Sequence, residues 1–167
     1  MAPAKKDIGS LDKLFTHMLR DIYYAENKIV KSLPAIIDKS HDSNLKQGLE
    51  EHLAQTRNHV SRLEKVFGQI GASADAVDCP AIDGIIDETN EIAGEVDDKR
   101  VLDAALIAAG QAVEHYEMTR YGTLIAWAKQ LGRADVASLL EQTLKEEKAA
   151  DAKLTSLAER GINAKAA

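Results

Sequence analysis

Cysteine, proline and aromatic residues are scarce in this sequence, and each scarcity excludes a class of structure. Cys79 is the only cysteine, so the chain can form no internal disulfide and no zinc or iron–sulfur site built from several cysteines. Aromatic residues make up 4% of the 167 residues and there are three prolines, whereas Ala, Leu, Glu, Lys and Asp dominate. This composition is typical of a helical bundle and not of a β-sheet protein.

The sequence also lacks a long apolar run and a basic face. The N-terminal MAPAKKDIGS contains two lysines with no apolar run after them, and no segment approaches the length of a membrane span. We therefore expect a cytoplasmic protein with no secretory signal and no membrane partner. The net charge of −6 argues against nucleic acid as a partner, because neutralising phosphates requires a basic face.

Helical periodicity fills most of the chain. Apolar residues that recur at steps of three and four predict long helices over about 10–39, 43–70, 99–131 and 133–161. A shorter amphipathic helix is predicted over about 82–93, and its apolar side could cover the core or form a dimer contact. We expect one domain over 1–167, with residues 1–9 and 162–167 as frayed tails.

The lengths of the connections predict the topology. Short turns join the first long helix to the second and the third to the fourth, so each pair should form an antiparallel hairpin. The connection over 71–98 is long enough to cross the length of the bundle. The predicted fold is therefore all-α: a ferritin-like four-helix bundle whose one long crossover carries the short extra helix.

All four inward-facing stripes become polar in their middle third, although a stripe that faces a core is normally apolar. The interruptions are Glu26 in the first helix, His52, Thr56 and His59 in the second, Glu114 and Glu117 in the third, and Glu147 and Asp151 in the fourth. Glu26 and position 59 are separated by 33 residues, as are Glu114 and Glu147. In two hairpins with similar turns, equal separations place each pair at the same height.

A dry interior cannot hold several ionised carboxylates side by side, because desolvation costs several kcal/mol per ion and like charges repel. Lys and Arg are missing from these inner positions, so protons or metal ions must neutralise the cluster. We predict two iron or manganese ions per chain, because carboxylates with histidine are typical of dinuclear sites in four-helix bundles. The predicted ligands are Glu26, His59, Glu114, Glu117, Glu147 and Asp151.

Two alternatives stay open at this point. The carboxylates could instead be partly buried groups that are hydrogen-bonded to Tyr or His. His52 could replace His59 as a ligand, but the two lie two turns apart, roughly 10 Å along the helix axis, so both should not bind one ion. The equal separation of 33 residues favours His59.

Several segments resemble known ferritin-like proteins. EHYEM (114–118) is similar to the third-helix motif of rubrerythrins, and HVSRL (59–63) resembles their second-helix motif. A fuller resemblance, over nearly the whole chain, is to the YciF/YciE-like bacterial stress proteins of the ferritin-like superfamily. The segments that carry it are DIYYAENKI, EHLAQTRNHVSRLE, CPAIDGIIDE, DAALIAAGQAVEHYEMTRYGTL and LLEQTLKEEKAADAKLTSLA.

The resemblance implies a ferritin-like bundle with an added helix, a homodimer, a candidate dinuclear metal site and induction under stress. The sequence departs from the rubrerythrin pattern at Thr56, where a Glu would precede His59, and at Ala150, where the fourth-helix His would stand. Asp151 is the nearest replacement for that histidine.

Three functions are compatible with these features. The first is a redox protein whose di-iron or di-manganese centre handles oxygen or peroxide. The second is a non-catalytic stress or interaction protein with a vestigial or single-metal site. The third, iron storage in a cage, is the least favoured, because no segment indicates cage contacts. The sequence identifies neither a substrate nor an electron donor, so whether the protein is an enzyme stays open.

Overall fold

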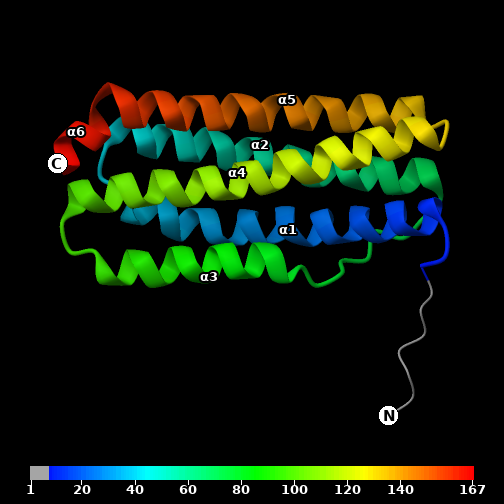
Figure 1. Ribbon diagram of the computed structural model, residues 1–167, viewed down its shortest axis with the longest axis horizontal. Helices are drawn as coiled ribbons and strands as arrows, with labels where there is room; N and C mark the ends of the chain where they lie inside the picture. The colour runs from blue at the N-terminus through cyan, green and yellow to red at the C-terminus, as the bar shows by residue number, and fades with distance from the viewer. Residues whose placement is uncertain (1–7) are drawn as a thin grey trace, which may run out of the picture.

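The computed structural model describes residues 8–167, and all regular structure in that range is helical (Figure 1). The first hairpin consists of α1 (Leu11–Lys39) and α2 (Ser43–Ile70), and the second of α4 (Lys99–Gln130) and α5 (Ala134–Leu157). Between them lies α3 (Pro80–Glu95), and the chain ends with η1 (Ala158–Ile162) and α6 (Asn163–Ala166).

The four long helices form a bundle in which α1 contacts α2 and α4, and α5 contacts the same two helices. Figure 1 shows α2 and α4 running in the same direction, which is possible because the segment carrying α3 returns along the length of the bundle. The predicted ferritin-like arrangement with one long crossover is confirmed. No helix within residues 8–167 is both long enough and apolar enough to span a membrane.

The helix ends follow the local sequence. Ser10 caps α1 by accepting a hydrogen bond from a backbone N–H of the first turn, and Asp42 and Asp98 do the same for α2 and α4. Gly71 ends α2 with φ 68°, a left-handed conformation that a residue with a Cβ adopts only with strain. Residues 8 and 9 precede α1 and are exposed, whereas 1–7 of the predicted N-terminal tail lie outside the described residues.

The extra helix α3 covers the bundle on the side of α1 and α4. Ile82 and Ile86 are buried, while Ile92 is 42% exposed. Asp83 fixes α3 to α1 because it accepts a hydrogen bond from Tyr24 and pairs with Lys28 at 3.0 Å. The apolar stripe of α3 therefore covers the core over most of its length.

The C-terminus differs from the frayed tail predicted over 162–167. The chain continues as a π-helical turn and then as α6, both of which contact α4. Ile162 is only 4% exposed, and Lys165 pairs with Asp42 at 3.0 Å. The prediction was wrong because Ile162 buries an apolar side chain, which stabilises helical structure beyond Gly161.

Apolar layers lie on both sides of the polar middle of the bundle. Phe15, Leu63, Leu124 and Leu140 pack toward one end, and Leu33, Leu49, Ile107 and Leu154 toward the other. Burying each large aliphatic side chain contributes roughly 1.5–3 kcal/mol. These layers position the polar side chains between them and keep water away.

Asp103 joins the second hairpin to the turn of the first. Its two carboxylate oxygens accept hydrogen bonds of 2.8 Å from the backbone N–H groups of His41 and Asp42, and the residue is 5% exposed. Asp103→Ala should lower the free energy of unfolding by about 2–3 kcal/mol, because two partly buried backbone N–H groups lose a charged acceptor. Urea unfolding measures this, with the exposed Asp97→Ala as the control. A loss under about 0.5 kcal/mol would contradict the assigned role.

Candidate metal centre

Six polar side chains converge in the middle of the bundle, and all four long helices contribute to them. They are Glu26 from α1, His52 and His59 from α2, Glu114 and Glu117 from α4, and Glu147 from α5. Glu26, His59, Glu117 and Glu147 are 0% exposed, Glu114 is 3% and His52 is 8% exposed. These six residues are called the polar cluster below.

The polar cluster divides into two overlapping groups, each of which could hold a metal ion. The first group is His52, Glu114, Glu117 and Glu147, and the second is Glu26, His59 and Glu147. Within a group, one ligand atom from each residue lies within 4.8 Å of the others. Glu147 belongs to both groups. Two adjacent positions that share a carboxylate are the arrangement expected of a dinuclear carboxylate site.

The closest contacts within the polar cluster involve the histidines. Nδ1 of His59 lies 2.9 Å from Oε1 of Glu147 and 3.5 Å from Oε1 of Glu26, and neither contact has hydrogen-bond geometry. Nε2 of His52 lies 3.1 Å from Oε1 of Glu114. Ligand atoms that crowd together without hydrogen-bonding one another could share a common cation.

Unsatisfied atoms show whether the cluster suits such a cation. Among residues 8–167, nine buried side-chain nitrogen or oxygen atoms lack a hydrogen bond, and eight of them belong to the polar cluster. A buried polar atom without a partner costs about 1–3 kcal/mol, so native proteins rarely leave several together. Carboxylate oxygens and imidazole nitrogens are ligands that iron, manganese and zinc accept. The residues therefore fit a metal ion.

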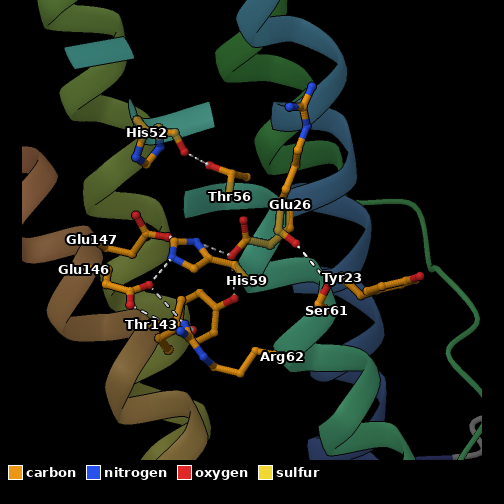
Figure 2. A network of polar contacts seen from close by, with 12 residues as sticks. Tyr23, Glu26, His52, Thr56, His59, Ser61, Arg62, Thr143, Glu146 and Glu147 are labelled. Atoms are coloured by element: carbon orange, nitrogen blue, oxygen red, sulfur yellow. Dashed lines mark hydrogen bonds and ion pairs between the residues drawn. The ribbon is translucent and has the colours of Figure 1, made fainter. Parts of the chain in front are cut away.

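A second set of side chains orients His59. Its Nε2 contacts Oε2 of Glu146 at 2.7 Å, and Arg62 holds the same carboxylate through contacts of 3.1 and 3.2 Å (Figure 2). Arg62 also donates to Thr143 at 2.6 Å. A carboxylate on one ring nitrogen fixes the tautomer and leaves the other nitrogen free to bind a metal. Glu146 thus directs Nδ1 of His59 into the cluster.

Glu26 is held in a similar way from α4. The hydroxyl of Tyr121, which is 0% exposed, donates a 2.5 Å hydrogen bond to Oε1 of Glu26. The other oxygen of Glu26 has no hydrogen bond and stays available. Tyr121 therefore fixes the direction in which Glu26 presents its free oxygen.

Burial changes the protonation of the carboxyl groups when no metal is present. Desolvation, followed by the charge of Glu147, raises the pKa of Glu114 to about 11. The same causes, with the charge of Glu26, raise the pKa of Glu117 well above its ordinary value. Burial also raises the pKa of Glu26. Metal-free protein at neutral pH therefore holds Glu114 as a neutral acid, and burial favours the neutral form of Glu117.

The pKa values of His59 and Glu147 move as those of an ion pair do. Burial alone would lower the pKa of His59, but its contacts with Glu147 and Glu26 outweigh burial and raise it to about 11. Burial alone would raise the pKa of Glu147, but the contact with His59 lowers it. Desolvation lowers the pKa of His52. The metal-free cluster is thus neutralised by protons and by one buried ion pair.

The structure brings together five of the six predicted ligands: Glu26, His59, Glu114, Glu117 and Glu147. Asp151 lies apart from them. It accepts a hydrogen bond from Gln111 at 3.1 Å, lies 3.3 Å from His115, and has a side chain that is 21% exposed. One turn beyond Glu147, the helix directs this carboxylate to the flank between α4 and α5.

Two residues of the site were missing from the predicted ligand set. His52 was on the inward stripe and was set aside because of its distance from His59, but the two histidines fall into different groups. Glu146 directly precedes Glu147 in α5, and adjacent residues of a helix point in different directions. Glu146 therefore lies off the inward stripe and faces α2. The stripe was a signal for His52, whereas nothing in the periodicity indicated the contact between Glu146 and His59.

Comparison with known proteins identifies the family of this chain. Residues 10–167 match a family described as a domain of unknown function, DUF892. The chain belongs to the DUF892 family. This DUF892 chain is 39% identical over 161 residues to Protein YciF of Escherichia coli (strain K12), a match that covers 96% of this chain and 97% of YciF. The resemblance to YciF-like stress proteins is confirmed.

Solved structures agree with the DUF892 assignment. The E. coli stress protein YciF superposes with a TM-score of 0.88 at 38% identity, covering 93% of this chain and 99% of YciF. YcfI from Rhodopseudomonas palustris gives a TM-score of 0.90 at 51% identity over 92% of this chain and 98% of YcfI. Protein XCC3681 from Xanthomonas campestris is 19% identical with a TM-score of 0.72, and this match supports the fold alone.

Proposed function

We propose that the polar cluster is a dinuclear site that binds two iron or manganese ions and handles oxygen or peroxide in a stress-associated redox reaction. The observation that carries this proposal is the sharing of Glu147 by two adjacent groups of potential ligands. Eight unsatisfied buried atoms in the same place support it, because cations would satisfy them.

The ligand types favour iron or manganese over other ions. The cluster offers four carboxylates and two imidazoles and no thiolate, since the only cysteine, Cys79, is outside both groups. Carboxylates with a smaller number of histidines suit redox-active iron and manganese, whereas copper(I) prefers sulfur ligands. A bound pair of such ions would supply one-electron chemistry with oxygen or peroxide.

The protein's own part is to hold the ligands and keep water out. Glu146 fixes His59 through a short contact to Nε2, and Tyr121 fixes Glu26 through a short hydrogen bond to Oε1. Complete burial of Glu26, His59, Glu117 and Glu147 excludes bulk solvent from the ligands. A dry, preorganised set of donors strengthens electrostatic interactions and limits side reactions of a reactive species.

A non-catalytic stress protein with a single metal ion is the second candidate. It is favoured by the unequal ligand sets, because the first group contributes four residues and the second three. The ion pair between His59 and Glu147 also neutralises part of the second group without a metal. In that case only the first group would be filled.

Metal content of protein purified without chelators or nickel resin separates the candidates. The dinuclear site predicts about two iron or manganese ions per chain, reduced in both Glu26→Ala and Glu114→Ala. Glu50→Ala is the control, since Glu50 is exposed on α2. One ion per chain that survives Glu26→Ala supports the single-metal alternative, and a metal-free protein of full stability contradicts both.

If two ions are present, the redox role predicts that anaerobically reduced protein consumes oxygen or peroxide faster than Glu114→Ala does.

Metal affinity should rise steeply with pH. Binding requires the loss of the proton of Glu114 and of the proton of the His59 ring, and the pKa of each is raised to about 11 in metal-free protein. Because protons compete with the metal well above neutral pH, the apparent affinity should weaken by about tenfold or more for each pH unit below 8. Competition of Mn²⁺ between the protein and an indicator at pH 6, 7 and 8 measures this, and a flat profile would argue against these ligands.

A homodimer, as implied by the resemblance, stays a prediction. Size-exclusion chromatography with light scattering tests it independently of the metal.

A further inference from the structure

A pocket of about 140 Å³ adjoins the polar cluster on the side of the α1–α2 turn. Its walls are mainly apolar and include Leu33 from α1, Leu49 from α2, Val113 from α4 and Leu154 from α5. Two members of the polar cluster, His52 and Glu114, also line it. The pocket therefore connects an apolar space with one end of the candidate metal centre.

Small residues make room for this pocket. Ala109 and Gly110 on α4 and Ala150 on α5 stand where larger side chains would fill it. At Gly110, a Cβ would lie 3.0 Å from Cδ1 of Leu154, so any larger residue there would have to displace the Leu154 side chain by a few tenths of an ångström. The space results from residue size at several positions and not from one missing side chain.

The inner end of the pocket carries unsatisfied polar atoms. Nδ1 of His52 and Oε2 of Glu114 have no hydrogen-bond partner, and the two side chains are only 9% and 3% exposed. At the outer end, Lys153 pairs with Glu51 at 2.6 Å, so the one cationic side chain that lines the pocket among residues 8–167 is already engaged. An occupant thus meets apolar walls, a hydrogen-bonding inner end and no free positive charge.

We propose that this pocket binds a small neutral alcohol or phenol, with its hydroxyl group toward His52 and Glu114, as the substrate or effector of the neighbouring centre. The role as substrate or effector rests on the proposed function, whereas binding itself does not. An engineered apolar cavity of about 150 Å³ holds benzene, so a pocket of this size suits a single ring or a short aliphatic chain.

The hydrogen-bond donors and acceptors at the inner end of the pocket are the reason for assigning a hydroxyl head group to the ligand. A hydroxyl group donates one hydrogen bond and accepts others, so it can satisfy both a carboxyl oxygen and a ring nitrogen in either tautomer. A charged head group would lose its hydration among apolar walls without a free counter-ion, which is unfavourable. In metal-free protein, where no cation satisfies them, a purely apolar molecule would leave Nδ1 of His52 and Oε2 of Glu114 without a partner.

Three probes of the same ring size test the proposal: benzyl alcohol, toluene and benzoate. Titration calorimetry or ligand-detected NMR on metal-stripped protein should show that benzyl alcohol binds about tenfold more tightly than toluene, with benzoate weakest. Equal binding of toluene and benzyl alcohol, or stronger binding of benzoate, would overturn the assigned head group. If none of the three binds, the pocket proposal fails even where metal analysis finds the centre loaded.

Leucine substitutions at alanines inside and outside the pocket show where the ligand binds. Ala109→Leu and Ala150→Leu, which fill the pocket from different helices, should each weaken benzyl alcohol binding by about tenfold or more, whereas Ala112→Leu on the exposed side of α4 should not. Nuclear Overhauser contacts from benzyl alcohol to methyl groups of Leu33, Leu49 and Leu154 in the unaltered protein give the same answer if a variant fails to fold. Contacts elsewhere would refute the assignment, and binding that is lost in metal-loaded protein would refute the role at the centre.

Discussion

Glu147→Gln should remove both metal ions from the protein at once. Glu147 is the one residue that belongs to both ligand groups, and both of its oxygens lack hydrogen bonds. Glutamine has nearly the same shape, but its amide presents one neutral oxygen in place of two charged ones. Loss of an outer partner of a metal ligand typically lowers affinity by about 10- to 100-fold, so loss of a shared ligand should exceed that range.

Variants that affect one group at a time provide the comparison. Glu26→Gln removes a ligand from the second group only, and His52→Ala from the first only. Each should retain about one ion per chain, while Glu147→Gln retains none, as measured by elemental analysis after dialysis against buffer. Retention of two ions by Glu147→Gln would show that the groups do not share this ligand.

Stability must be measured together with the metal content of Glu147→Gln. The substitution removes the carboxylate that lies 2.9 Å from Nδ1 of His59 and whose contact keeps that ring protonated. Breaking a buried ion pair from one side costs about 3–5 kcal/mol. The variant should therefore unfold at lower urea concentration than the unaltered protein when both are metal-free, and its metal content should be compared only where circular dichroism shows it folded.

The fold was predictable because each helix carries a regular apolar stripe and each turn carries a residue that ends or begins a helix. Gly71 and Asp42 are examples, and the long helices begin and end close to the predicted positions. The convergence of Glu26, His59, Glu114 and Glu147 was predictable for the same reason. Residues that face the core from different helices, at equal heights above their turns, come close together in the middle of the bundle.

The parts that were not predictable depend on side-chain direction and on contacts between helices. Asp151 has the spacing of the inward stripe, but its side chain turns toward Gln111. Glu146 lies off the stripe, but its side chain contacts His59 on the neighbouring helix α2. The helical C-terminus depends on one buried side chain, Ile162, in a segment whose composition resembles a frayed tail. Periodicity describes one helix at a time and cannot report such pairings.

Glu117 is the residue at which metal binding and stability should conflict most strongly. It is 0% exposed, neither oxygen has a hydrogen bond, and burial together with the charges of Glu147 and Glu26 raises its pKa well above the ordinary value. In metal-free protein, burial thus favours the neutral form of Glu117, and neither oxygen has a hydrogen-bond partner. Methionine has a similar length and no group that needs a hydrogen bond.

Glu117→Met should therefore stabilise the metal-free protein, by about 1–3 kcal/mol at pH 5, the cost of an unsatisfied buried group. The gain should grow as pH rises. A carboxyl whose folded pKa is raised binds its proton more tightly in the folded than in the unfolded state. Above the pKa of the unfolded state, near 4.5, the Glu117 carboxyl group therefore lowers the free energy of unfolding of the unaltered protein by up to about 1.4 kcal/mol for each pH unit. Urea unfolding of both proteins at pH 5, 6 and 7 measures the difference, with the exposed Glu50→Met as the control.

The effect of metal should have the opposite sign. Added Mn²⁺ should raise the unfolding temperature of the unaltered protein, because a ligand that binds only the folded state stabilises it, and should raise that of Glu117→Met less, because only the second group stays intact in this variant. If Glu117→Met instead destabilises the metal-free protein by more than about 1 kcal/mol, the carboxyl group has partners that matter for folding. In that case its burial would no longer indicate a cation. The combination of gain without metal and loss with it is what distinguishes a metal ligand from a structural acid, because a structural acid would lose stability in both states.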